Sequence, residues 1–226
     1  YEGEVITGQG GVSLNGTGHI GNQFKSFVFK GPVTANNIKV GNIIGEDVGI
    51  GNTTINTNIK LSIIQDSTIS VAADGRIEST SFKEYHYSNI FFNGVYSGNN
   101  IVADIRSDTE RNKFDLSGDI TFGEIMKFDV KGDVERLELT PFVAIESWKD
   151  PYLRVNIDGN LSGRSLDDLT GMVVIDNISL ADSNFFYNPG AIYLQALPDE
   201  GEGKKIEFMS SFFEGNITGD YYFSTI

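Results

Sequence analysis

The sequence predicts an all-β protein, an elongated and strongly curved antiparallel sheet that forms an open, apolar-lined groove. Three observations predict this class. Apolar and polar residues alternate along most of the chain, turn-forming residues interrupt the alternation at short intervals, and glycine recurs inside the alternating runs. The composition agrees, because 16 Phe and 9 Tyr favour strands, while 26 Gly with only 5 Pro favour turns and bends.

Alternation with a period of two is typical of half-buried strands, whose side chains point in turn to opposite faces of a sheet. The clearest runs are Ile55, Thr57, Ile59 and Leu61; Ile101, Ala103 and Ile105; and Leu153, Val155 and Ile157. Turn signals at 98–100, 107–110, 188–190 and 198–203 separate the runs. One short helix is expected at 165–169, where Ser165 can cap it. Because no stretch is typical of a linker, we expect one repeat-built domain over residues 1–226.

A short repeat, read as apolar, polar, Gly, any residue, apolar, occurs seven times in phase with the alternation. Its glycines are Gly31, Gly75, Gly94, Gly118, Gly132, Gly159 and Gly215. Each glycine therefore falls on the apolar face of a strand, where a large side chain is expected. Glycine inside a strand weakens it, so we interpret the seven as strand-bending positions that curve the sheet into a trough. The alternative is that they mark hairpin turns.

The charge excludes several classes of partner. The formal net charge is -14, which disfavours nucleic acid and anionic membrane surfaces. There is no cysteine, so disulfides and thiolate metal sites are excluded. No window reaches the roughly 18 apolar residues of a membrane span. The chain starts at Tyr1 and ends within an alternating pattern at Ile226, so we expect it to be an internal segment of a longer protein.

No set of residues predicts an active site, and we expect neither an enzyme, nor a metal site, nor a cofactor. His19 lies in a Gly-rich run, and His86 is expected to be an exposed strand residue. Asp119 and Asp133 follow successive repeat glycines and are expected to be neighbours on the polar face. A glycosidase would need such a pair in a cleft rather than in solvent. The acidic stretch 198–203 is a weak calcium candidate, and 8–22 lacks the carboxylates that a calcium loop requires.

The C-terminal part of the chain resembles a known family. Its elements are "IDGNLSG", "SLDDLTGMVVIDNISL", "FFYNPGAIYLQAL" and "KIEFMSSFFEGNITGDY", and the segments from "TINTNIKLSII" to "FDLSGDITF" repeat the same pattern more loosely. In this repeat style the chain is similar to the translocation and assembly module B (TamB) proteins, of the AsmA-like group, especially those of Bacteroidetes. The resemblance covers most of the chain and depends on no invariant catalytic motif.

The resemblance implies a periplasmic segment of a bridge between the inner and outer membranes of a Gram-negative bacterium. The bridge is anchored in the inner membrane by a helix that this sequence does not contain. It conducts phospholipid along a hydrophobic groove, supports outer-membrane biogenesis and protein translocation, and meets an Omp85-type outer-membrane protein through a region outside this sequence.

On this interpretation phospholipid acyl chains lie along inward apolar side chains. The candidates are Phe92, Phe114, Leu116, Ile120, Phe122, Phe128, Val130, Val134, Val155, Ile157, Leu161 and Phe213. Truncated sheet edges are also expected to favour self-association.

Three alternatives remain open at this point. The same apolar residues could pack against one another and close an ordinary core without a ligand. The chain could be a surface adhesin or β-solenoid binding module, with Tyr85, Tyr87, Tyr96 and Phe91 as an aromatic patch for carbohydrate. It could also chaperone outer-membrane strands by pairing with them at a sheet edge.

Overall fold

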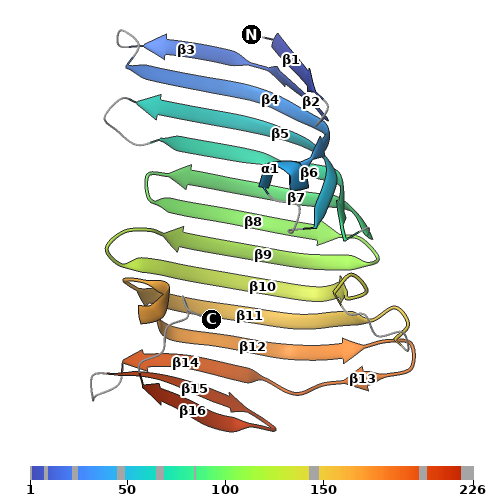
Figure 1. Cartoon of the computed structure of the whole chain (residues 1–226), viewed down its shortest axis with the longest axis vertical. Helices are drawn as coiled ribbons and strands as arrows, with labels where there is room; N and C mark the ends of the chain where they lie inside the picture. Colours follow the sequence, from blue (N-terminus) through green and yellow to red (C-terminus); the bar gives the residue numbers. More distant parts are fainter. Residues whose placement is uncertain are drawn as a thin grey trace. The chain divides into compact units, whose positions relative to one another are not determined.

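In the computed structural model nearly all of the chain that is described forms antiparallel strands (Figure 1). The described residues are 2–7, 10–21, 25–44, 49–64, 69–83, 85–142, 148–198 and 203–219. They fall into two compact units, Tyr1–Glu110 and Arg111–Ile226. The expectation of a single domain over residues 1–226 stays a prediction.

The first unit holds eight strands and one helical turn. They are β1 (Glu2–Thr7), β2 (Gly10–Asn15), β3 (Thr17–Gly21), β4 (Ser26–Lys39), α1 (Val40–Ile44), β5 (Ile50–Ile64), β6 (Ser70–Phe82), β7 (Tyr85–Ser97) and β8 (Asn100–Asp108). The strands lie in the order β1-β2-β4-β5-β6-β7-β8, and β3 also pairs with β4. The helical turn α1 was not predicted from the sequence.

The second unit also holds eight strands. They are β9 (Asn112–Thr121), β10 (Met126–Glu138), β11 (Tyr152–Gly163), β12 (Thr170–Ala181), β13 (Phe186–Tyr187), β14 (Ile192–Pro198), β15 (Lys204–Ser210) and β16 (Glu214–Gly219). Their order is β9-β10-β11-β12-β14-β15-β16, with β13 beside β12. The helix expected at 165–169 is a 3-10 turn at Leu166–Asp168, preceded by Ser165. The predicted class, a curved and open antiparallel sheet, is confirmed.

Three asparagines inside strands adopt the left-handed backbone conformation. Asn37, Asn89 and Asn177 have positive φ angles of 53°, 57° and 49°, and each is followed by isoleucine. Asn37 and Asn177 lie where the pairing of β4 with β5 and of β12 with β11 shifts register. Asparagine tolerates this left-handed conformation better than most residues, and an irregularity of this kind bends a strand.

The seven repeat glycines all lie inside strands rather than in hairpin turns. The strand that contains each glycine pairs with its adjacent strands without a change of register at the glycine. None of the seven glycines is therefore a β-bulge. The shifts occur elsewhere, for example between Val134 and Leu137. Their role in bending the strands stays a prediction.

What surrounds each glycine differs. A Cβ at Gly75 would lie 2.8 Å from the backbone atom Thr57 Cα, so the backbones of β5 and β6 approach too closely there for any side chain. At Gly132 the neighbour is a side chain, since Leu116 Cδ2 would lie 2.9 Å away. At Gly94 and Gly118 the nearest atoms would be 3.7 and 3.9 Å away, which leaves the space above the backbone open.

Substitution by alanine separates these cases. We expect Gly75→Ala to lower the free energy of unfolding by about 1–3 kcal/mol, because β5 would have to move away. Gly94→Ala, on the next strand, should leave the free energy of unfolding unchanged or raise it by up to about 1 kcal/mol, because alanine reduces the conformational entropy of the unfolded chain. Urea denaturation of both variants measures the difference, and equal effects at the two positions would contradict the close approach at Gly75.

Candidate functional site

One face of the second unit is apolar across neighbouring strands, and we call it the apolar face. Cross-strand partners lie on the same side of a sheet, so the register defines its members. They are Phe114, Leu116, Ile120, Phe128, Val130, Val134, Val155, Ile157, Leu161, Val173, Ile175, Ile192, Leu194, Ala196, Ile206, Phe208 and Ile217, with Gly118, Gly132, Gly159, Gly171 and Gly215 among them.

The described residues bury very little of this face. Apart from Pro141 and Pro151, only three apolar side chains among them are buried, Val134, Val155 and Ala181, with 6%, 6% and 4% of their surface exposed. No large side chain in the described chain is completely buried, and Val130 is 40% exposed. A closed core of this size would hold many completely buried aliphatic and aromatic side chains. The apolar face is therefore a partly exposed surface, on which Val130 and Ile217 are exposed and most other side chains are of intermediate burial.

A strip of small residues crosses β9–β11 on the apolar face. Gly118 pairs with Val130, and Val130 pairs with Gly159. Larger side chains flank this strip. Leu116 and Ile157 lie on one side, with Gly132 between them, and Ile120, Phe128 and Leu161 lie on the other. We call Gly118, Val130 and Gly159 the small-residue strip, which runs across the strands rather than along them.

The first unit repeats this arrangement on its own apolar face. Ala73 pairs with Gly94, and Gly94 pairs with Ala103, which gives a row of small residues across β6–β8. The row Val71, Tyr96 and Ile101 flanks it on one side, and the row Gly75, Phe92 and Ile105 on the other.

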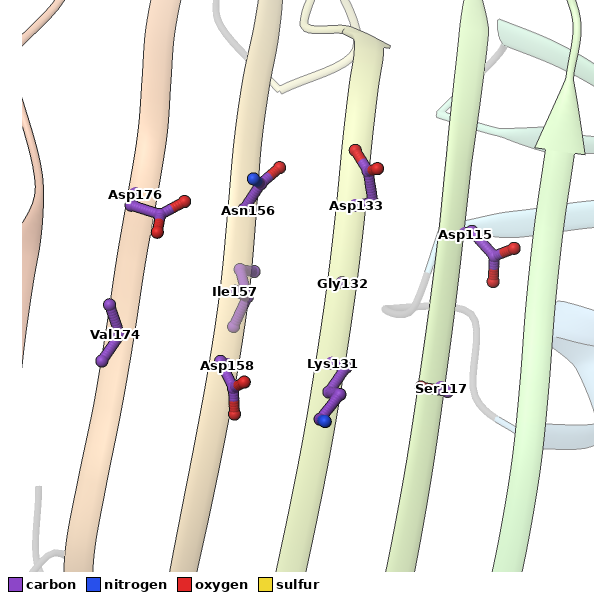
Figure 2. A pocket seen from close by; sticks show the side chains of 10 residues that line it. All are labelled: Asp115, Ser117, Lys131, Gly132, Asp133, Asn156, Ile157, Asp158, Val174 and Asp176. Atoms are coloured by element: carbon purple, nitrogen blue, oxygen red, sulfur yellow. The ribbon is translucent and has the colours of Figure 1, made fainter.

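The opposite face of the second unit is polar over β9–β11, while over β12–β15 it also holds Met172, Val174, Tyr193 and Met209. A shallow hollow lies on this face (Figure 2). Its volume is about 500 Å³, and its lining comes from β9, β10, β11 and β12. Asp115 pairs with Asp133 directly across the strands, and Lys131 pairs with Asp158. Like charges placed opposite each other destabilise a sheet, which fits a solvated surface better than a closed site. No group of three or more His, Asp or Glu in the described chain could hold a metal ion.

A second hollow, of about 460 Å³, lies in the first unit. Its lining is mostly polar and includes Glu4, Ser13, Asn15 and Thr34 from β1, β2 and β4. These two hollows, which are lined by described residues, are therefore mainly polar. The expected groove with an apolar lining stays a prediction.

Most of the predicted groove residues come together in the structure. Nine of the twelve lie on the apolar face of β9–β11. Phe92 lies on the corresponding face of the first unit. Phe122 and Phe213 fall outside the strands, just after β9 and just before β16, and are 40% and 57% exposed. The alternation in the sequence continues past the ends of these strands, which is why pattern reasoning included both residues.

Pattern reasoning missed the part of the apolar face that lies on β12, β14 and β15. Val173 pairs with Gly159 and with Leu194, which pairs in turn with Phe208. Residues 192–196 alternate with a period of two and carried part of this signal, whereas residues 172–175 are all apolar, and neither run contains the glycine repeat.

The pattern also misplaced two sets of polar and aromatic residues. Asp119 and Asp133 are both on the polar face, but Asp119 pairs with Asp129 and Asp133 with Asp115, so the two are not cross-strand neighbours. Phe91 and Tyr96 lie five residues apart in the regular part of β7 and therefore point to opposite faces, so the four-residue aromatic patch does not form on one surface.

The remaining candidates are placed as follows. His19 in β3 and His86 in β7 are exposed. Most of the acidic stretch 198–203 lies outside the described residues, as do the ends of the glycine-rich stretch 8–22. Within the described chain, none of the helical segments is long and apolar enough to cross a membrane.

Comparison of the chain with protein-family models, with curated proteins and with solved structures gives no match.

The polar face of the first unit holds one carboxylate with a shifted pKa. The Arg76 side chain donates a hydrogen bond to Glu78, and Asn56 Nδ2 donates another to Glu78 Oε1 at 3.0 Å. These bonds, the one from Arg76 first, hold the pKa of Glu78 below its ordinary value of 4.5. Arg76 also lies over the Phe91 ring, 5.8 Å from its centroid.

We expect the Glu78 carboxyl to titrate below 4.5, and Arg76→Gln to raise its midpoint. Because the folded-state pKa is depressed, the stabilisation from this group is present above the unfolded-state pKa and is lost as pH falls through the folded-state value. An NMR titration of the side-chain carboxyl carbon measures both midpoints. A midpoint at or above 4.5 in the parent would contradict the assigned hydrogen bonds.

Proposed function

We propose that this chain is a segment of a lipid conduit, which holds phospholipid acyl chains on its apolar faces without catalysing a reaction. The observation that carries the proposal is the continuous apolar face of the second unit, which the described residues leave partly exposed. Apolar surface of this extent is rarely left in water without a ligand or partner.

The small-residue strip supports an acyl chain as the occupant. A Cβ at Gly118 would have only Asp129 O near it, at 3.9 Å, so no side chain covers the Gly118 end of the strip. An acyl chain lying across β9–β11 would contact Leu116 and Ile157 on one side and Phe128 on the other. Each methylene removed from water contributes about 0.8 kcal/mol. No charged side chain lies on this face at these rows, so the head group stays in solvent and the lipid is free to move along.

The wider setting of the proposal comes from the resemblance to TamB proteins. The segment belongs to a periplasmic bridge that is anchored in the inner membrane and that delivers phospholipid toward an Omp85-type protein of the outer membrane. The polar face, with Asp115, Asp133 and Asp158, keeps the bridge in solution.

Bound lipid tests the proposal directly. We expect the purified chain to carry phospholipid in stoichiometric amount, and Leu116→Glu/Ile157→Glu to lose at least nine-tenths of it. Both substitutions place a carboxylate beside Gly132 on the apolar face, where an acyl chain would have to desolvate it. Mass spectrometry of the organic extract measures the lipid.

Ser117→Glu/Thr121→Glu is the matched control. It adds the same charge to the polar face of β9, opposite Lys131 and Lys127, and should retain the lipid of the parent. Circular dichroism checks that both variants fold. A parent free of lipid would contradict the conduit and favour a closed core or an adhesin, and equal loss in both double variants would show that charge rather than the apolar face decides binding.

Filling the small-residue strip is the second test. Gly118→Leu places a large side chain in open space on the apolar face, and we expect it to remove at least half of the bound lipid while the chain stays folded. Ser117→Leu, one position earlier and on the polar face, should leave the lipid unchanged. The same lipid-to-protein ratio in both variants would contradict an acyl chain in the strip.

A further inference from the structure

Four apolar side chains form a patch on the opposite face of the second unit, over β12, β14 and β15. Met172 and Val174 lie in β12, Tyr193 lies in β14, and Met209 lies in β15. The register places Val174 beside Tyr193, and Tyr193 beside Met209, so these three form a row across the strands. Met172 is two residues before Val174 and therefore lies on the same side of β12. We call these four residues the methionine patch.

The methionine patch is open to solvent. Met172, Tyr193 and Met209 are 47%, 42% and 51% exposed. Single apolar residues are common on protein surfaces, but a contiguous group of large ones is typical of a binding surface. Methionine adapts its shape to different partners, and tyrosine often contributes a large part of the binding energy at protein interfaces. The patch therefore has the composition of a surface that contacts another polypeptide.

A carboxylate lies at each end of the row. Asp158 in β11 is the cross-strand partner of Val174, and Glu214 in β16 is the partner of Met209. Both carboxylates are exposed, and neither forms an ion pair with another described residue. The row therefore has an apolar middle and an acidic group at both ends.

The acidic character extends beyond the row at one end. The hollow of Figure 2 borders the methionine patch at Val174 and Asp158. Its charged lining consists of four carboxylates and one amine, which are Asp115, Asp133, Asp158, Asp176 and Lys131. On β15, Lys205 forms an ion pair with Glu207, and the two together add no net charge. The surroundings of the patch therefore favour a cationic partner.

From this arrangement we infer that the methionine patch docks a basic amphipathic helix of another polypeptide. Neighbouring strands lie about 4.8 Å apart, so Asp158 and Glu214, which are four strand spacings apart, are separated by about 19 Å. A helix rises about 1.5 Å per residue, so about 13 residues span this distance. Apolar side chains at i, i+3, i+4 and i+7 would contact the patch, and basic side chains at both ends would reach the carboxylates.

Two further points define the inference. A second copy of this chain is disfavoured as the occupant, because each copy carries a net charge of -14. The inference does not depend on the lipid conduit, because the methionine patch and the apolar face lie on opposite sides of the sheet.

Two fluorescein-labelled peptides test the inference by fluorescence anisotropy with the purified chain. KRALSALLASLARK places its leucines on one side of a helix, whereas KRLALASASLALRK contains the same residues with the leucines on opposite sides. We expect the first peptide to bind at least about tenfold more tightly, because only this peptide presents an apolar stripe between its basic ends. Raising the salt concentration should weaken its binding, since the contacts at both ends are between exposed charges.

Substitutions in the chain locate the site. Met209→Ser should weaken binding of the first peptide about five- to tenfold, because an apolar contact is lost. Asp158→Asn/Glu214→Gln preserves the size of both side chains and should weaken binding by a similar factor, with a smaller dependence on salt. This double variant changes only exposed carboxylates, so it tests the inference even if Met209→Ser does not fold.

Two matched controls change the same kinds of residue outside the methionine patch. Ile125→Ser removes an apolar side chain that is 55% exposed between β9 and β10. Glu124→Gln/Asp150→Asn removes two exposed carboxylates from connections between strands. Both controls should bind the first peptide within twofold of the parent.

Three results would overturn the inference. One is the absence of binding up to millimolar peptide, and another is equal affinity for the two peptides, which would show that charge alone attracts them. The third is a dimer of the chain in sedimentation that Met209→Ser dissociates, which would assign the methionine patch to a second copy of this chain.

Discussion

The register of the antiparallel ladders is the constraint on which the rest of this structure depends. Because side chains alternate along each strand, a slip of one residue would move every apolar side chain of that strand to the polar face. In the second unit the register places Phe114 beside Val134, and Val134 beside Val155. The same ladders place Asp115 beside Asp133 on the other side. One set of pairings thus produces both the apolar face and the acidic surface opposite it.

The glycines can be understood only from this register. Gly132 lies between Leu116 and Ile157, whose side chains fill the space above it, whereas nothing but backbone approaches the space above Gly118. Two glycines of the same sequence repeat therefore differ in what they do. Gly132 leaves room for the side chains of Leu116 and Ile157, whereas Gly118 leaves a space on the apolar face that no side chain covers. A strand with a full set of large side chains could provide neither, which explains why the chain tolerates the entropy cost of glycine inside its strands.

The sequence predicted the features that depend on one strand at a time. Alternation identified the all-β class and assigned Leu116, Ile120, Val155 and Ile157 to one face, because period 2 is a local property. Alternation could not predict features that depend on the pairing between strands, on where a strand ends or on irregular residues within a strand. Phe122 follows the alternation but lies beyond the end of β9, and the stacking of Trp148 on Phe185 joins segments far apart in the sequence. The left-handed asparagines gave no signal because their residue type is common in turns and strand ends alike.

The central claim is that an acyl chain occupies the apolar face and not the polar one. Site-specific photocrosslinking in living cells tests this most directly, with benzoylphenylalanine placed at Leu116 in one variant and at Ser117 in another. The two positions are adjacent in β9 and point to opposite faces. The account predicts phospholipid adducts from position 116 and none from position 117, as measured by mass spectrometry of the labelled peptides. Adducts from neither position, or from both equally, would contradict it.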